Sequence, residues 1–556
     1  MECRYLKQSP KPEDRIVQIS DMTSCKFNRY IKRNEFSRDR DRILFSKAFR
    51  RLQHKVQVYS FEEGDHYRTR LTHTLEVTQI ARALSNALEV NVDLTEAIAL
   101  GHDIGHTPFG HQGERTLDEI MRGSDSLGKN KIIETSFDYG GFKHNYNSVR
   151  ILADVERRDE NKDGLNLTWQ VLEGIFKHTR IHRNEQELSG SYGDWDIKRF
   201  VNDPELVKNL HIDKKDSVSI EGQIVAVADE IAQRQHDLDD GLRDQSLGLK
   251  VDELYSNIIK ITSDLLSTYN ETINEISERQ NLNKCVKNMI ILNETLRSKE
   301  NSKDVQYKSN CLQKYITKYF LTDVLDTTKY NIKVLTENDY EMVDQEPILK
   351  KKVVCFSDIG GSLNKEIEKF IRNRIINSYK VNRFDGKSQY IVKQLFKAYY
   401  ENPLQMHEEV LNKIENTIKT NSIIYKIKLE NNKYKGLMLD QIHFKTSNNE
   451  ETKVLIETLR LENLKRNLQT PSDFEEVCLK SAHSVELFNY IRDIKCNVIN
   501  GNNQPSIEAI KDRYAEKDLF TNCLLENNYA FLSIICYHIS GMTDSYAKLQ
   551  FRELYQ

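Results

Sequence analysis

The stretch that most constrains this chain runs from Gly101 to Glu114 and follows a short apolar run, Ala97–Leu100. Five ionisable residues lie in it: His102, Asp103, His106, His111 and Glu114. Ionisable groups next to an apolar run are costly to bury unless they are paired or bind a metal. Adjacent residues on a helix point about 100° apart, yet two such neighbours can still reach one ion above the helix surface. The stretch therefore predicts a mixed imidazole and carboxylate metal site, with further ligands from elsewhere in the chain.

The composition limits the class of protein. The 556 residues include 81 Lys+Arg and 84 Asp+Glu, a formal net charge of −3, which argues against a generally basic nucleic-acid-binding surface but allows a local basic pocket. The nine cysteines are scattered and form no Cys-x-x-Cys pair, a pattern typical of reduced thiols. No apolar run approaches the ~20 residues of a membrane span, and we see no signal-peptide core. We expect a cytoplasmic protein with no membrane partner.

Helical periodicity dominates the apolar residues, so the chain is expected to be all-α. The clearest helical patterns cover residues 68–88, 94–105, 165–177, 219–240, 366–379 and 388–400, with a further helix starting near Gly110. His73 lies near the buried edge of the first of these helices. Asp229 interrupts the apolar middle of the helix over 219–240, so it should be paired or metal-bound. Residues 353–356 suggest either a short strand or a buried helix start.

Four residues from three of these helices form a candidate metal set: His73, His102, Asp103 and Asp229. Two imidazoles with two carboxylates suit Mn, Fe, Zn, Ni or Co, and the carboxylates also allow Mg. Beyond the break at Pro108, His111 and Glu114 are three residues apart, so they share a helix face and Glu114 can orient the His111 imidazole.

The four-residue set resembles the signature of the HD-domain phosphohydrolase superfamily, a lone His, a His-Asp pair and a distant Asp. Within that superfamily the chain is similar to the deoxyguanosine triphosphate triphosphohydrolase (dGTPase-like) family. The resemblance covers both ends of the chain and is weakest over 250–350 and 405–525. The supporting stretches are 49–58, 68–73, 101–114, 141–145, 165–168, 173–178, 221–231, 364–404 and 539–547.

The resemblance implies an enzyme with an HD-domain helical core and a mostly helical C-terminal associated region. It implies hydrolysis of dGTP to a deoxynucleoside and inorganic triphosphate, with other dNTPs as further candidate substrates. The four-residue set would hold a divalent metal ion, most simply Mn²⁺ or Mg²⁺, with Fe, Zn, Ni or Co also compatible. A homo-oligomer, often a hexamer in this family, and a nucleotide effector are further implied.

The resemblance also assigns roles to single residues. His111, Glu114 and His106 would be catalytic, with His111 as acid or base near the scissile P–O bond. Arg70 and Lys177 would offset the triphosphate charge. The full substrate-binding set would be Gln57, Arg70, His144, Lys177, Gln233 and Asp237, of which Gln57 and Asp237 would hold the sugar 3′-hydroxyl.

Two departures from the family pattern bear on function. Family members commonly carry a Tyr four residues after the metal Asp, where this chain has Gln233, and an amide does not form the same flat apolar wall against a 2′-hydroxyl. Residues 405–525 exceed the usual connection, and long insertions often carry partner or regulatory surfaces. The expected domains are an N-terminal arm (1–37), the HD core (38–260), the associated region (261–404), the insertion (405–525) and a C-terminal helix (526–556).

Two alternatives to a dNTP hydrolase stay open. Gln233 favours a ribonucleotide or mixed NTP phosphohydrolase. A nucleic-acid-binding or regulatory protein could instead retain the HD site as a sensor, and single-stranded nucleic acid would then be its partner. The near-neutral charge and the complete set of catalytic groups disfavour this second alternative. A role in nucleotide-pool control and one in depleting dNTPs during phage infection are both compatible with the sequence.

Overall fold

The computed structural model describes residues 8, 33–57, 68–125, 127, 141–157, 164–179, 204–273, 279–343, 346–402, 405–411, 413 and 532–555. The chain divides into two compact units. The first comprises residues 1–114, 142–388 and 543–545, and the second comprises 115–141, 389–542 and 546–556. The expected arm (1–37) and insertion (405–525) fall almost wholly outside the described residues, so the proposed domain boundaries stay a prediction.

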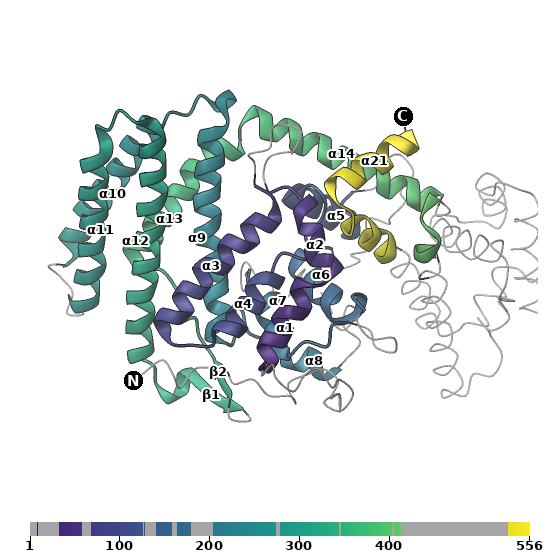
Figure 1. Cartoon of the computed structure of the whole chain (residues 1–556), viewed down its shortest axis with the longest axis horizontal. Coiled ribbons are helices and arrows are strands. Elements are labelled where there is room, and N and C mark those ends of the chain that lie inside the picture. Colours follow the sequence, from purple (N-terminus) through teal and green to yellow (C-terminus); the bar gives the residue numbers. More distant parts are fainter. Residues whose placement is uncertain are drawn as a thin grey trace, which may run out of the picture. The chain divides into compact units, whose positions relative to one another are not determined.

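The first unit is built around a long helix, α9 (Ile220–Arg243). Helix α3 (Arg70–Leu88) packs along it, and α4 (Val92–Gly101) and α7 (Trp169–Phe176) contact it from the same side (Figure 1). Helix α1 (Glu35–Leu44) packs on α4. Apolar side chains with almost no exposure fill the space between these helices: Val77, Leu84, Leu94, Ile98, Val171, Ile175, Ile224 and Ile231. The site residues on α3 and α9, and those that directly follow α4, thus project from a closely packed helical core.

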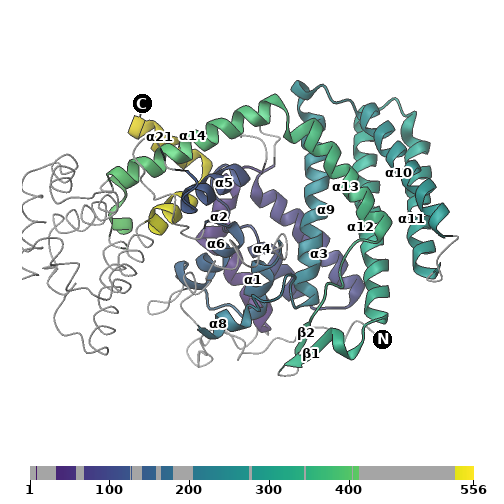
Figure 2. The same ribbon diagram turned by 180° about the vertical axis from the view of Figure 1, so that it is seen from behind.

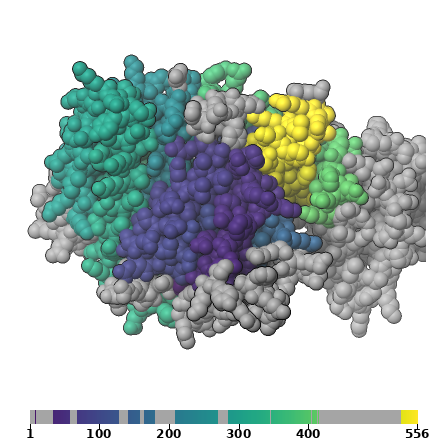
Figure 3. All heavy atoms as spheres, in the orientation of Figure 1, coloured from purple at the N-terminus to yellow at the C-terminus, as the bar shows by residue number. Residues whose placement is uncertain are grey.

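A second group of helices covers the other side of α9. It consists of α10 (Val251–Ile273), α11 (Arg279–Glu300), α12 (Val305–Lys333) and α13 (Asp358–Ile371). These helices contact one another, and α12 and α13 also contact α9 (Figure 2). On the face shown in Figure 3, the atoms of α10–α12 (teal) lie next to those of α1 and α3 (purple and blue). The all-α prediction is confirmed.

Capping residues fix where the helices of the site begin. Thr69 and Thr72 form a reciprocal capping box at the start of α3. The side chains of Asn91 and Ser219 accept hydrogen bonds from the backbone amides of Leu94 and Gly222, in the first turns of α4 and α9. Helix α4 ends at Gly101, so the expected helix over 94–105 is shorter, and Asp103 lies in a turn. The prediction of a helix near Gly110 is confirmed by α5 (Gly110–Met121).

One small sheet departs from the sequence-based expectation. Strands β1 (Tyr340–Val343) and β2 (Glu346–Leu349) form an antiparallel hairpin that apolar periodicity did not indicate. The segment at 353–356 is neither strand nor helix. Instead, the side chain of Gln223 accepts hydrogen bonds from the backbone amides of Val353 and Val354 at 2.8 and 3.1 Å, which replaces a strand partner for these buried residues.

The remaining elements are shorter or lie partly in the second unit. They are α2 (Lys47–Arg51), η5 (Leu52–His54), α6 (His144–Arg150), η7 (Ile151–Val155), α8 (Pro204–Asn209), η10 (Gln245–Leu247), η11 (Glu337–Asp339), η12 (Arg372–Ile376), α14 (Tyr379–Glu401) and α21 (Asp544–Tyr555). Within the second unit, the Tyr399 ring contacts His538 of the helical stretch 532–540, and the Tyr399 hydroxyl bonds to Gln550. Among the described helices, none combines the length and the apolar composition that crossing a membrane requires.

Candidate active site

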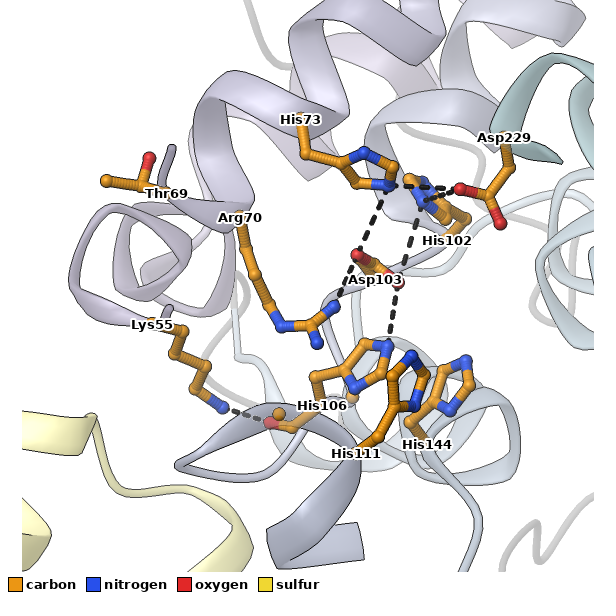
Figure 4. A network of polar contacts seen from close by, with 12 residues as sticks. Lys55, Thr69, Arg70, His73, His102, Asp103, His106, His111, His144 and Asp229 are labelled. Atoms are coloured by element: carbon orange, nitrogen blue, oxygen red, sulfur yellow. Dashed lines mark hydrogen bonds and ion pairs between the residues drawn. The ribbon is translucent and has the colours of Figure 1, made fainter. Parts of the chain in front are cut away.

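Four side chains from three places in the fold converge as the sequence predicted. His73 comes from α3, His102 and Asp103 follow the end of α4, and Asp229 comes from the middle of α9. Nε2 of His73 lies 3.0 Å from Oδ1 of Asp229 and 3.8 Å from Oδ2 of Asp103. Nε2 of His102 lies 3.5 Å from Oδ1 of Asp103 and 3.8 Å from Oδ1 of Asp229. Figure 4 shows these four groups pointing toward one another.

The donor atoms of this cluster suit a divalent cation. The His102 ring is fully buried and its Nδ1 lies 2.7 Å from the carbonyl of Ala99. A carbonyl only accepts, so Nδ1 carries a proton, and in the neutral ring Nε2 presents a lone pair. That Nε2 has no hydrogen-bond partner, and a buried orphan of this kind needs an explanation such as an ion. His73, His102 and Asp103 offer ligand atoms within 4.8 Å of one another.

The charges of the cluster favour ionised carboxylates. Burial alone would raise the pKa of Asp229, but the hydrogen bond to His73 and the nearby His102 outweigh it and lower that pKa. Burial would likewise raise the pKa of Asp103, and His106, His102 and Arg70 together hold it well below its ordinary value. Ionised carboxylates are the form that a cation binds.

A buried arginine lies beside the cluster. Nη1 of Arg70 donates to Oδ2 of Asp103 at 2.8 Å, while its Nε and Nη2 are buried without a partner. A Cβ at Gly110 would lie 3.0 Å from Arg70 Nη2, so glycine leaves the guanidinium room. Nearby, the Lys55 ammonium donates to the carbonyl of His106 (Figure 4), and burial lowers the pKa of Lys55 to about 7. Unpaired guanidinium donors in a buried site are suited to an anionic ligand.

A group of imidazoles adjoins the cluster on the side of Asp103. Nε2 of His106 lies 3.0 Å from Oδ1 of Asp103, and the rings of His106 and His144 stack with centroids 3.8 Å apart. This approach requires Gly105, because a Cβ there would lie 2.1 Å from the His144 carbonyl oxygen. His111 is the most accessible member, with its side chain 57% exposed.

Glu114 has a different main partner from the one that spacing indicated. Its Oε2 lies 2.8 Å from Nδ1 of His144, but 3.7 Å from Nδ1 of His111 and 4.0 Å from Nδ1 of His106. Burial opposes the charged form, yet His144 and His111 hold the pKa of Glu114 well below its ordinary value. The carboxylate therefore orients His144 more directly than His111.

Two further histidines were not identified as site residues from the sequence. His178, just after α7, lies with Nε2 3.1 Å from Nε2 of His144. His236, on α9, lies with Nδ1 3.1 Å from Nδ1 of His73 and bonds through Nε2 to Glu76. His178 ends the quoted stretch 173–178, so its motif was visible, but only the fold brings it to the cluster.

The expected substrate-binding residues occupy distinct places. Oε1 of Gln57 is buried without a partner. Asp229, Gln233 and Asp237 follow one another at four-residue steps on α9, and burial raises the pKa of Asp237 to about 7. Lys177 is buried, pairs with Oε1 of Glu173 at 2.9 Å and donates to the carbonyl of His211 at 2.8 Å. Its ammonium is thus already neutralised by the residue one turn earlier.

Comparisons with known proteins agree with this geometry. The HD domain family matches residues 70–233, and the phosphohydrolase-associated domain family matches residues 354–422. Fold and site thus define an HD-domain protein. The chain is 35% identical over 369 residues to a deoxyguanosinetriphosphate triphosphohydrolase-like protein of Rickettsia bellii, covering 66% of this chain and 80% of that protein. It is 36% identical over 387 residues to a protein of the same name from Bartonella henselae, covering 68% of this chain and 81% of that protein. The chain belongs to the deoxyguanosinetriphosphate triphosphohydrolase-like family.

Proposed function

We propose that this protein is a metal-dependent dNTP triphosphohydrolase that converts dGTP to a deoxynucleoside and inorganic triphosphate, with the other dNTPs as further candidate substrates. The observation that carries the proposal is the buried cluster in which His102 Nε2 and two Arg70 donors lack partners. A metal cation would satisfy the first and phosphate oxygens the second. The names of the relatives support the same reaction for this chain.

His73, His102, Asp103 and Asp229 would hold a divalent ion, Mn²⁺ or Mg²⁺ in the first instance, with Fe, Zn, Ni or Co compatible with the same donors. When bound, such an ion supplies Lewis-acid polarisation of a phosphate oxygen. Glu76 would orient this set indirectly. Its carboxylate accepts a hydrogen bond from Nε2 of His236, and Nδ1 of His236 faces Nδ1 of His73. Partners of this kind fix the tautomer of a ligand histidine.

The residues around the cluster would orient and neutralise the triphosphate. Arg70 would direct Nε and Nη2 at phosphate oxygens, and His106 would face the same group from the stacked imidazoles. The family resemblance also places His144 next to the phosphates. His111 is exposed and close to Glu114, so it would exchange a proton with the 5′-oxygen of the leaving deoxynucleoside.

The sugar would lie along α9. Gln57 and Asp237 would bond its 3′-hydroxyl, and Gln233 would lie beneath C2′. Lys177 has a supporting part in this proposal, because its pairing with Glu173 leaves less charge for the triphosphate than the sequence suggested.

A substrate panel tests the proposal. The purified protein is incubated with each of the four dNTPs and four NTPs in Mn²⁺ or Mg²⁺, and triphosphate, pyrophosphate and phosphate are separated. We expect inorganic triphosphate with a molar equivalent of deoxynucleoside, dGTP being the preferred substrate. Release of phosphate or pyrophosphate, or no turnover of any nucleotide, would contradict the proposal.

One observation favours a second candidate, a ribonucleotide or mixed NTP phosphohydrolase. Gln233 is half-buried at the position where a ring would exclude a 2′-hydroxyl. The same panel separates the two, since comparable rates for GTP and dGTP would favour the second candidate. The main proposal includes a cytoplasmic location and a homo-oligomer such as a hexamer. Its biological role would be nucleotide-pool control or phage defence.

A further inference from the structure

Arg68 lies just before α3 and reaches the last turns of α9. Its Nη1 donates to Oδ2 of Asp239 at 2.6 Å and to Oδ1 of Asp240 at 3.0 Å, and its side chain is 16% exposed. Both carboxylates are buried, and Asp237 is buried on the same helix. We propose that Arg68 is a positioning residue for the sugar of the nucleotide, because it holds the turn of α9 from which Asp237 meets the 3′-hydroxyl. This inference deepens the proposed function and rests on it.

The end of α9 carries negative charge where a helix tolerates it least. Asp237, Asp239 and Asp240 lie in the last turns of α9, which ends at Arg243, and the helix macrodipole already places partial negative charge there. Asp237 and Asp240 are three residues apart and thus share one face of the helix. Two buried carboxylates on one face repel each other unless a cation lies nearby. Arg68 supplies a cation to this face from a different element.

The pKa values of the two carboxyl groups reflect this balance. Burial raises the pKa of Asp237 to about 7, and Arg234 and Arg68 oppose the rise while Asp240 adds to it. Burial also raises the pKa of Asp240 to about 6, and Arg68 opposes that rise. Loss of Arg68 would raise both pKa values further and leave Asp237 as a neutral acid. A neutral acid is a weaker hydrogen-bond acceptor for a sugar hydroxyl than a carboxylate.

The remaining contact of Arg68 lies toward the metal set and is weaker. Nε of Arg68 lies 3.4 Å from Oε1 of Glu76, whose side chain is 40% exposed. This ion pair is longer and more solvated than the pairs with Asp239 and Asp240, so it contributes less. Glu76 would also keep its bond to His236 after the loss of Arg68. Replacement of Arg68 should therefore leave the metal content unchanged.

The competing explanation is purely structural, with Arg68 only fastening α3 to α9, which pack along each other (Figure 1). Gln313 of α12 donates to the other oxygen of Asp239 at 2.7 Å, so the end of α9 is also held from a second side. The two explanations differ for a nucleotide that lacks the 3′-hydroxyl. A structural defect would slow the hydrolysis of every nucleotide alike, whereas a displaced Asp237 affects only nucleotides that carry the hydroxyl.

The test compares dGTP with 2′,3′-dideoxy-GTP in the full-length protein with Mn²⁺. We expect the wild type to prefer dGTP about tenfold or more in kcat/KM, the scale of one hydrogen bond to a charged group. In Arg68→Met this ratio should fall toward one, because hydrolysis of dGTP slows while that of the dideoxynucleotide changes little. The metal content should match that of the wild type. Equal slowing of both nucleotides, or loss of metal, would overturn the inference.

Further variants assign the effect to Asp237. Asp237→Asn should lower the ratio as Arg68→Met does, and the double variant should lower it no further, since both changes act on one contact. A further fall in the double variant would mean that Arg68 acts elsewhere. If Arg68→Met fails to fold by circular dichroism, Arg68→Gln replaces it and should lower the ratio in the same way; an unchanged ratio would overturn the inference.

Arg243 provides the matched control. Its Nε also pairs with Asp239, at 3.2 Å, but its side chain is 48% exposed. Arg243→Met therefore removes a cation from the same end of α9 while leaving the pair between Arg68 and Asp240. It should keep the wild-type ratio, and a fall equal to that in Arg68→Met would show that any loss of positive charge there suffices, against the inference.

The outcomes distinguish this inference from the proposed function. If the wild type hydrolyses dGTP and the dideoxynucleotide with equal kcat/KM, the inference is overturned and the proposed function stands. If it hydrolyses no nucleoside triphosphate, the proposed function is overturned, and the dissociation constants of the two nucleotides, measured by isothermal titration calorimetry, decide the inference. Tighter binding of dGTP that is lost in Arg68→Met would then support it, and a preference unchanged in that variant would overturn it.

Discussion

The carboxylate of Asp544 accepts a hydrogen bond from the backbone amide of Phe109 at 2.9 Å, although the two residues are 435 positions apart. Its other oxygen accepts from the amide of Val56 at 3.0 Å. Phe109 and Gly110 both have positive φ, +62° and +58°, a conformation that is costly for phenylalanine. Asp544 therefore ties the turn that leads to His111 to the segment that leads to Gln57.

Replacing Asp544 should impair hydrolysis without removing metal. Asp544→Ala leaves two amides unsatisfied, at about 1–3 kcal/mol each, and releases the turn before His111. We expect kcat to fall roughly 10- to 100-fold while the metal content is unchanged. The exposed neighbour Ser545 provides the control, as Ser545→Ala keeps the Asp544 carboxylate in place. Wild-type kcat in Asp544→Ala would mean that the turn keeps its shape unaided.

The metal set can be tested with an isosteric change. Asp103→Asn keeps the shape of the side chain but removes the charge that pairs with Arg70 and His106. Bound metal and nucleotide hydrolysis should be lost together, because a neutral amide is a far weaker ligand for a divalent ion. Asp237→Asn, a change to another buried carboxyl group, should retain the metal. Equal metal content in Asp103→Asn and wild type would disprove the assignment of this ligand.

The convergence of His73, His102, Asp103 and Asp229 could be predicted because its signature is carried by residue types at fixed places in or just after strongly periodic helices, while their binding of a metal stays a prediction. His73, Asp103 and Asp229 each interrupt or follow an apolar helix. The helices themselves were predictable for the same reason, since α3 and α9 have long apolar stripes and clear capping residues. The ends of the helices were harder to predict, because α4 ends at Gly101 and not at the expected residue 105.

Contacts across the fold were not predictable from spacing. Glu114 was expected to face His111 three residues earlier, but His144, 30 positions further on, takes the shorter contact. Lys177 was expected to face phosphate, but Glu173 one turn before it takes the ammonium. The Glu173–Lys177 pair is an i,i+4 contact, so spacing offered it, but the sequence could not rank it against a phosphate partner. His178 was missed for a different reason, because its partner His144 lies 34 positions earlier in the chain, on α6.

His111 should be needed for turnover but not for metal. His111→Ala removes an exposed imidazole that is absent from the four-residue cluster, so we expect wild-type metal content and a loss of kcat on the order of 10² or more, the scale of a general acid or base. Gln112→Ala, the adjacent position on α5, should retain most activity. An inactive His111→Ala that also lacks metal would indicate a ligand role instead.

Gln233 should weaken discrimination against ribonucleotides. Asp229, Gln233 and Asp237 lie about 6 Å apart along one helix, so a sugar between the metal and Asp237 must pass over Gln233. A tyrosine there would leave a 2′-hydroxyl unsatisfied, at a cost of about 1–3 kcal/mol. Gln233→Tyr should raise the preference for dGTP over GTP about tenfold or more in kcat/KM. If wild type already rejects GTP and Gln233→Tyr changes nothing, another residue forms the wall.

Glu221 should make the stability of the protein fall as pH rises. The side chain is fully buried near the start of α9, and its Oε1 accepts from the amides of Asn91 and Gln8 at 2.9 and 3.3 Å. Burial, assisted by nearby Glu346, raises the pKa of Glu221 to about 7 from 4.5, against the effect of those hydrogen bonds. The folded state therefore binds this proton more tightly than the unfolded state. The resulting stabilisation is fully present below about pH 4.5 and is lost as pH rises through about 7.

Glu221→Gln removes this titration while keeping an oxygen for the two amides. The free energy of unfolding should be similar in variant and wild type at pH 5, and higher in the variant at pH 8.5 by up to about 3 kcal/mol, the equivalent of the shift in pKa. Urea unfolding measures the free energy of unfolding of both proteins at each pH. Subtracting the wild-type value from the variant value cancels the contributions of the other titrating groups. The exposed Glu119→Gln controls for the loss of a charge. An equal difference at the two pH values would show that Glu221 ionises normally in the folded protein.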